Sequence, residues 1–167
     1  MAADAAEPFD PRAILSALER RRVAYIVIGA VARVLHGTDE VTDGLDVCPQ
    51  LRPENAERLA DALEDLGALG AADRNRVTAI AAGTMSTFDS AHGPLKIVPT
   101  PEGTRGGWDD LRRHANRDAL GDGLRVPVAA LDDLLRMTSA LNREQDQEVR
   151  RQMRRLQELD RSPSLGR

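Results

Sequence analysis

The chain has 167 residues, which is enough for one hydrophobic core and short for two. Its formal net charge is -4, from 23 basic and 27 acidic residues, so no overall positive field favours a nucleic-acid partner. The single cysteine excludes an internal disulfide, no signal peptide is expected, and no apolar stretch approaches the roughly 20 residues that span a bilayer. These features favour a cytoplasmic protein without membrane contact.

Helical and strand patterns alternate in the first half of the chain. The predicted elements are a helix, a strand, a helix, a strand and a helix over residues 9–22, 23–28, 30–36, 45–48 and 53–66. Asp10 and Pro11 suit the first turn of the first helix. The run that follows it is continuously apolar and rich in β-branched residues, which is typical of a buried strand. This strand ends at Gly29, and Gly37 ends the second helix.

The second half is less regular. Its predicted elements are strands over 76–82, 84–88 and 95–98, a helix over 108–115, a hairpin within 119–126, and helices over 130–141 and 145–159. Helices interleave with short strands, and there is no repeat and no internal linker. We therefore predict an α/β fold with a mixed β-sheet flanked by helices. It forms one domain over residues 9–160, with flexible ends at 1–8 and 161–167.

Six segments carry a resemblance to a known fold. They are Tyr25–Gly37, Thr42–Val47, Pro53–Leu59, Gly93–Val98, Pro101–Leu111 and Val128–Met137. In this order they resemble the nucleotidyltransferase superfamily, and within it the bacterial AbiEii-type and MenT-type toxins and their uncharacterised actinobacterial relatives. The resemblance covers residues 9 to about 146. It implies a nucleotidyltransferase-like core with C-terminal helices.

The chemistry of this superfamily depends on carboxylates that hold two divalent ions against phosphate groups. Two acids come from an Asp-x-Asp on one strand, whose alternation points both to one face, and a third comes from a neighbouring strand. A glycine-led turn at a helix N-terminus offers backbone N–H groups to the triphosphate. The resemblance places this turn at Gly29 and Ala30, where the family usually has Gly or Ser at the second position.

The carboxylate set of the family is incomplete in this chain. The Asp-x-Asp pattern falls on Gly44 and Asp46, and the third acid falls on Lys96. Asp43 is one residue from the missing acid, and this offset turns its side chain to the other face of the strand. A lysine of the relatives' late helix corresponds to Thr138. The family positions that still match are Gly29, Arg33, Asp46, Arg143 and Asp146.

These differences disfavour metal binding. They change the local charge by about +3, and unit charges roughly 4 Å apart interact by about 4 kcal/mol at an effective dielectric near 20. We therefore expect no metal cofactor, and magnesium only if transfer survives. Asp46 and Lys96 are predicted to face one cleft as the degenerate catalytic site, with Lys96 as counter-ion to Asp46, as an anion binder or as an amine nucleophile. The candidate ligand-binding residues are Gly29, Ala30, Arg33, Asp43 and Arg143.

Four functions are compatible with these residues. The favoured one is a fold that has lost two-metal transfer and binds a nucleotide, another anionic small molecule or a partner protein. The second is a transferase that uses Asp43 and Asp46 in a shifted arrangement and modifies RNA. The third is a metal-free enzyme that uses the same cleft with Lys96, and the fourth is a structural role.

One charged helix stands apart from the cleft residues. Arg150, Arg151, Arg154 and Arg155 form a basic stripe that would suit RNA. Acidic residues interleave with the stripe, namely Glu148, Glu158 and Asp160, so a solvated helix face is the favoured interpretation. Nucleic acid is therefore a disfavoured partner.

Overall fold

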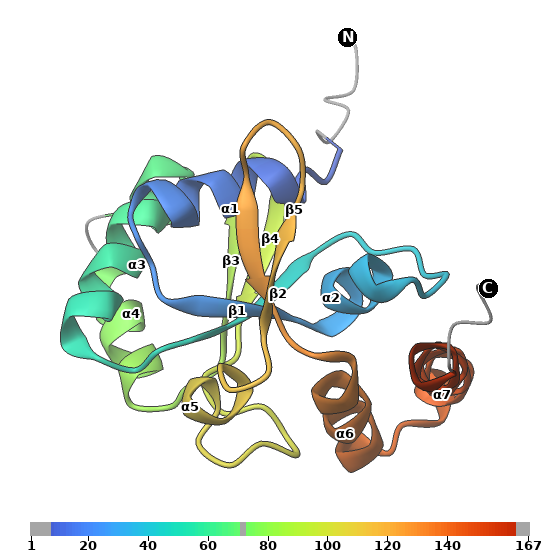
Figure 1. Cartoon of the computed structure of the whole chain (residues 1–167). Coiled ribbons are helices and arrows are strands. Elements are labelled where there is room, and N and C mark those ends of the chain that lie inside the picture. Colours follow the sequence, from blue (N-terminus) through green and yellow to red (C-terminus); the bar gives the residue numbers. More distant parts are fainter. Residues whose placement is uncertain (1–7, 71–72, 163–167) are drawn as a thin grey trace, which may run out of the picture.

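Within residues 8–70 and 73–162, which the computed structural model describes, six strands form one mixed sheet in the order β3-β4-β2-β1-β6-β5 (Figure 1). The strands are β1 Tyr25–Ile28, β2 Leu45–Pro49, β3 Ser86–Ser90, β4 Gly93–Ile97, β5 Asn116–Ala119 and β6 Arg125–Val128. The chain-order neighbours β1 and β2, β3 and β4, and β5 and β6 pair antiparallel. β1 pairs parallel with β6, and β2 pairs parallel with β4. The predicted α/β class with a mixed sheet is confirmed.

Helices cover both sides of this sheet. They are α1 Pro11–Arg20, α2 Gly29–His36, α3 Pro53–Asp65, α4 Arg74–Ala81, α5 Trp108–Leu111, α6 Leu131–Leu141 and α7 Gln147–Arg161, with a 3-10 helix at Glu144–Asp146. In Figure 1, α3 and α4 lie to the left of the sheet, and α2, α6 and α7 lie to its right. None of the helices in the described part of the chain has the length and apolar character needed to cross a membrane.

The elements around β1 form as their sequence predicts. All four residues of β1 are buried, as expected for a strand that is covered on both faces. The Asp10 carboxylate accepts a hydrogen bond from the backbone N–H of Ala13, which caps α1. Gly37 ends α2 with a φ of 122°, a value that favours glycine. The start of α2 lies at the C-terminal end of β1, because Gly29 directly follows Ile28.

The prediction of a strand over 76–82 is wrong. The segment belongs to helix α4. Its buried apolar residues, Val77 and Ile80, are three positions apart, which matches one face of a helix, whereas a half-buried strand would bury alternate residues. The next predicted strand starts two residues late, at Ser86. The helix predicted over 108–115 is a single turn that ends at Leu111, because the chain turns there to enter edge strand β5.

The two predicted flexible ends fall for the most part outside the described residues, at 1–7 and 163–167. Arg161, which the prediction places in the C-terminal end, is the last residue of α7. The Ser162 hydroxyl donates a hydrogen bond to the carbonyl of Glu158, which extends the ordered turn by one residue.

Candidate functional site

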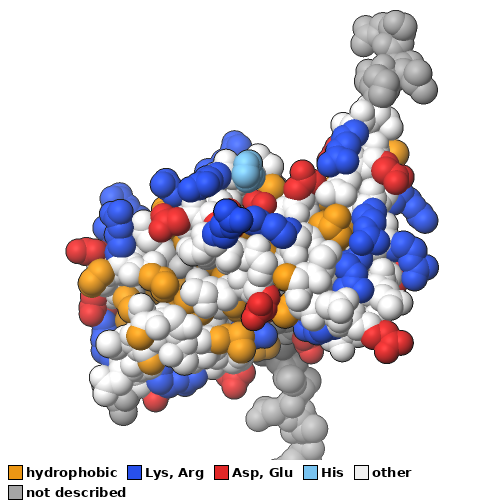
Figure 2. All heavy atoms as spheres, turned by 90° about the horizontal axis from the view of Figure 1, so that it is seen from below, with side chains coloured by type: hydrophobic (Ala, Val, Ile, Leu, Met, Phe, Trp, Pro, Cys, Tyr) orange, Lys and Arg blue, Asp and Glu red, His pale blue; other side chains and the backbone are white. Residues whose placement is uncertain are grey.

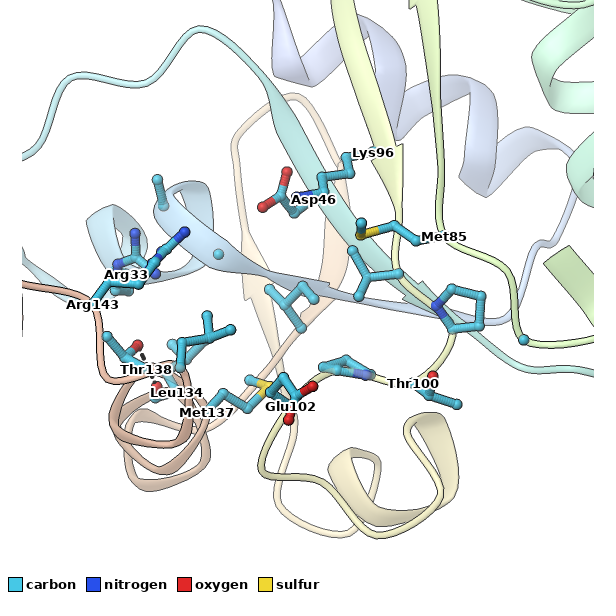
Figure 3. A pocket seen from close by; sticks show the side chains of 18 residues that line it. Arg33, Asp46, Met85, Lys96, Thr100, Glu102, Leu134, Met137, Thr138 and Arg143 are labelled. Atoms are coloured by element: carbon cyan, nitrogen blue, oxygen red, sulfur yellow. Dashed lines mark hydrogen bonds between the residues drawn. The ribbon is translucent and has the colours of Figure 1, made fainter. Parts of the chain in front are cut away.

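A cleft of about 510 Å³ opens at the C-terminal end of β1. Its walls come from the start of α2, from β2 and β4, from the loop after β4, and from α6 (Figure 3). Its polar lining side chains are Arg33, Asp46, Lys96, Thr100, Glu102, Thr138 and Arg143. The fold therefore brings most of the predicted site residues together from segments that are far apart in the sequence.

Asp46 and Lys96 lie next to each other on neighbouring strands. They are direct partners in the parallel pairing of β2 with β4. Because side chains alternate along a strand, partners at one register position point to the same face of the sheet. Both side chains line the cleft, which confirms the prediction that they face it together.

Gly29 brings the first turn of α2 against the Asp46 carboxylate. Its φ of +68° lies in the left-handed region, which favours glycine. A Cβ atom at this position would lie 2.5 Å from Oδ2 of Asp46 and 3.0 Å from its Cγ. The backbone conformation and the available space therefore both require glycine. Ala30 follows in the same turn and also lines the cleft.

Asp46 is the half-buried carboxyl group of the cleft. Burial is the largest influence on its pKa and raises it above the ordinary value, while the charges of Lys96, Arg33 and Arg143 act in the opposite direction. No hydrogen bond or ion pair joins Asp46 to Lys96, so the predicted contact between counter-ions does not form. Side chains at paired positions extend from the sheet alongside each other, and Lys96 acts on Asp46 through its field alone.

The two arginines of the cleft each form an ion pair with a carboxylate that does not line the cleft. Arg33 donates two-pronged hydrogen bonds to Glu40, and the side chains are only 11% and 13% exposed. Arg143 donates from Nε to Asp146 at 2.6 Å, and the Asp146 side chain is 8% exposed. These pairs neutralise the guanidinium charges and fix their positions at the cleft wall.

Lys96 differs from these arginines. Among the described residues, no carboxylate forms an ion pair with it, and its ammonium makes no hydrogen bond. It is also the only lysine of the chain. The cleft therefore has one cation that is available to a ligand without breaking an existing pair.

Asp43 and Gly44 stand just before β2. Asp43 is exposed and is not among the residues that line the cleft, so the fold does not bring it together with Asp46. Gly44 lies in the bend immediately before β2, two positions before Asp46. A Cβ atom added there would contact Cγ of Pro94 at 3.2 Å.

The apolar wall of the cleft and one of its acids were not predicted from the sequence. Met85, Leu134 and Met137 line it, and Glu102 reaches it from the loop after β4 (Figure 3). The α6 residues match the ordinary pattern of a core-facing helix, so no local signal marks them as cleft residues. For Glu102 a signal was present, because it lies in one of the segments that resemble the superfamily.

Metal-ligating side chains are sparse in the cleft. Its carboxylates are Asp46 and the exposed Glu102. In residues 8–70 and 73–162, no group of three or more His, Cys, Asp or Glu side chains could hold a metal ion. The donors present therefore do not fit the coordination of two divalent ions by three carboxylates.

Comparison with known proteins supports the fold. No family model matches the sequence, and no curated protein sequence matches it. The solved structure of TM1012 from Thermotoga maritima, assigned as a nucleotidyltransferase, is similar with a TM-score of 0.55 over 87% of this chain and 90% of that one, at 16% identity. The chain has a nucleotidyltransferase fold. The antibiotic-resistance factor ANT(2'')-Ia is a more distant neighbour, with a TM-score of 0.48 and 15% identity over 87% of this chain and 79% of that one. In this nucleotidyltransferase fold, the cleft lies at the β1–α2 turn.

Proposed function

We propose that this nucleotidyltransferase-fold protein binds a nucleotide in its cleft and does not carry out two-metal nucleotidyl transfer. The observation that carries the proposal is the position of Lys96, paired in register with Asp46 and without an ion-pair partner among the described residues. An ammonium group therefore stands where the resemblance implies a metal-ligating carboxylate.

The electrostatic cost of a metal at this place supports the proposal. Neighbouring strands lie about 4.8 Å apart, so a divalent ion on Asp46 would be held near the Lys96 ammonium. At about 5 Å and an effective dielectric near 20, the two would repel each other by roughly 7 kcal/mol. One carboxylate whose burial already raises its pKa offers little to offset this repulsion.

The other walls of the cleft suit the two parts of a nucleotide. The Lys96 ammonium and the unpaired backbone N–H groups at the start of α2 suit a phosphate group. Met85, Leu134 and Met137 offer an apolar surface to a base. The volume of about 510 Å³ lies within the range of small-molecule sites. In this proposal the phosphate of the nucleotide contacts the Lys96 ammonium directly, and no metal ion lies between them.

Calorimetric titration with AMP and ATP in EDTA tests the proposal. Lys96→Met should weaken binding by about 10- to 100-fold, the effect of losing one hydrogen bond to a charged group. Arg20→Met is the matched control, because Arg20 is exposed on α1 away from the cleft and the substitution removes the same charge. It should leave the affinity unchanged.

The same proteins decide between binding and transfer. We expect magnesium not to strengthen ATP binding, and no radiolabel to pass from nucleoside triphosphates to RNA or protein. Turnover that requires magnesium and disappears in Asp46→Ala would overturn the proposal and favour the RNA-modifying transferase that the resemblance to AbiEii-type and MenT-type toxins implies. Equal affinity of wild type and Lys96→Met would contradict the assigned role of Lys96.

A further inference from the structure

A second hollow, of about 380 Å³, lies between α6 and the first turns of α7. All of its lining residues are polar or charged, namely Ser139, Asn142, Gln147, Arg150, Arg151 and Arg154. Figure 2 shows basic side chains gathered at the right of the molecule, over α7. Three arginines of the predicted basic stripe thus converge on one concave surface instead of spreading over a convex helix face.

The positive charge of this hollow is only weakly balanced. Arg151 pairs with Glu148 at 3.2 Å, but both side chains are more than 60% exposed, at 66% and 63%, and such pairs are weak in water. Arg150 donates a hydrogen bond to the backbone carbonyl of Arg143 at 3.2 Å. This bond orients the Arg150 side chain, but a neutral carbonyl does not balance its positive charge. Arg154 forms no ion pair or side-chain hydrogen bond with any described residue. The hollow therefore presents an excess of guanidinium charge.

The hollow adjoins the cleft. The chain reverses at Asn142, which ends α6 in the left-handed conformation with φ 48° and ψ 42°. Leu141 and Arg143, on either side of it, line the cleft, while Asn142 itself lines the hollow. The two cavities are therefore separated by a single turn of chain, and the Arg150 hydrogen bond to Arg143 ties their walls together.

We propose that this hollow is a phosphate-binding subsite that receives phosphate groups of a ligand whose nucleotide end lies in the cleft. The second half of this statement rests on the proposed function. Guanidinium groups recognise phosphate oxygens through paired N–H donors, and, among the described residues, no apolar or aromatic side chain lines the hollow. The three arginines therefore suit the hollow to phosphate groups. The phosphates belong either to a nucleic-acid strand or to a free polyphosphorylated nucleotide.

Titration with inorganic tripolyphosphate at low salt tests the subsite by itself. Arg150→Gln/Arg154→Gln should weaken its binding at least tenfold. The matched control is Arg155→Gln/Arg161→Gln, which removes the same charge from the same helix outside the hollow. Equal weakening by both pairs would show a general attraction of anions to α7 and would overturn the subsite. Arg154→Gln alone removes no ion pair or side-chain hydrogen bond among the described residues, so a loss of binding with an unchanged melting temperature in this variant assigns the effect to the subsite.

Longer ligands then identify the source of the phosphates. A pentanucleotide single strand and adenosine tetraphosphate are each compared with AMP. The one that uses the subsite should bind more tightly than AMP, and this gain should disappear in Arg150→Gln/Arg154→Gln. If the double variant binds both longer ligands as much more tightly than AMP as wild type does, or if neither ligand binds more tightly than AMP, the link between hollow and cleft is wrong. If AMP fails to bind while tripolyphosphate still depends on the hollow arginines, the proposed cleft function fails and the subsite stands.

Discussion

Replacement of Gly29 by alanine tests whether the Asp46 carboxylate packs against the start of α2. The new Cβ would lie 2.5 Å from Oδ2 of Asp46, a distance that non-bonded atoms do not tolerate. Asp46 would therefore have to leave its rotamer. The alanine would also have to keep a φ of +68°, in the left-handed region.

The two costs can be sized separately. An alanine in the left-handed region costs about 1–2 kcal/mol. Moving Asp46 away from its preferred rotamer costs about 0.5–1.5 kcal/mol more. Gly67 provides the matched control, because its φ is +67° and a Cβ there would meet nothing within 4 Å. Gly67→Ala should therefore lower the free energy of unfolding by the backbone term alone, and Gly29→Ala by about 2–3 kcal/mol.

Urea unfolding at pH 7, followed by circular dichroism, measures both variants. In an Asp46→Ala background the carboxylate is gone and only Cβ of residue 46 remains close, at 3.1 Å, so the cost of Gly29→Ala beyond that of Gly67→Ala should become smaller. If Gly29→Ala and Gly67→Ala are equally destabilising in the wild-type background, the Asp46 carboxylate does not contact this turn. The same conclusion would follow if Asp46→Ala left the cost of Gly29→Ala unchanged.

Two further predictions concern the charges of the cleft. Burial raises the pKa of Asp46, so the unfolded chain loses this proton at a lower pH than the folded chain. The free energy of unfolding therefore falls as the pH rises through the interval between the two pKa values. Asp46→Asn should therefore be more stable than wild type in urea at pH 7 and lose that advantage below about pH 4, near the ordinary pKa of Asp; an advantage independent of pH would contradict this. Gly44→Asp together with Lys96→Asp introduces acids at the positions where the resemblance implies them. This double variant should be destabilised by repulsion with Asp46, and magnesium should raise its melting temperature and not that of wild type. A melting temperature of the double variant that ignores magnesium would show that positions 44 and 96 are not metal positions.

Local patterns were sufficient for the elements that surround the cleft. The apolar run of β1, the capping Asp10 and the terminating Gly37 each specify their element through burial or backbone conformation of nearby residues. Segment 76–82 shows where local patterns compete. The strand prediction for it was wrong because Val77 and Ile80, three residues apart, can both be buried against the core only when the segment is helical.

The candidate site divides in the same way. The order of segments and the alternation along β2 and β4 were enough to predict that Asp46 and Lys96 face one cleft. The sequence by itself thus determined the fold class, most elements and the residue types at the positions where the resemblance implies carboxylates. It could not determine which of these groups touch, because a contact depends on side-chain directions set by packing across the whole domain.

Three features of the protein were decided only by the tertiary structure. Lys96 extends beside Asp46 without forming an ion pair with it. Arg33 and Arg143 each form an ion pair with a carboxylate outside the cleft. Glu102 enters the cleft from a loop. The arginines of α7 converge on a hollow because α6 packs against that helix. Ion pairs and concave surfaces form where separate segments come within a few ångströms of each other. The spacing of residues along the sequence does not give the distances between such segments.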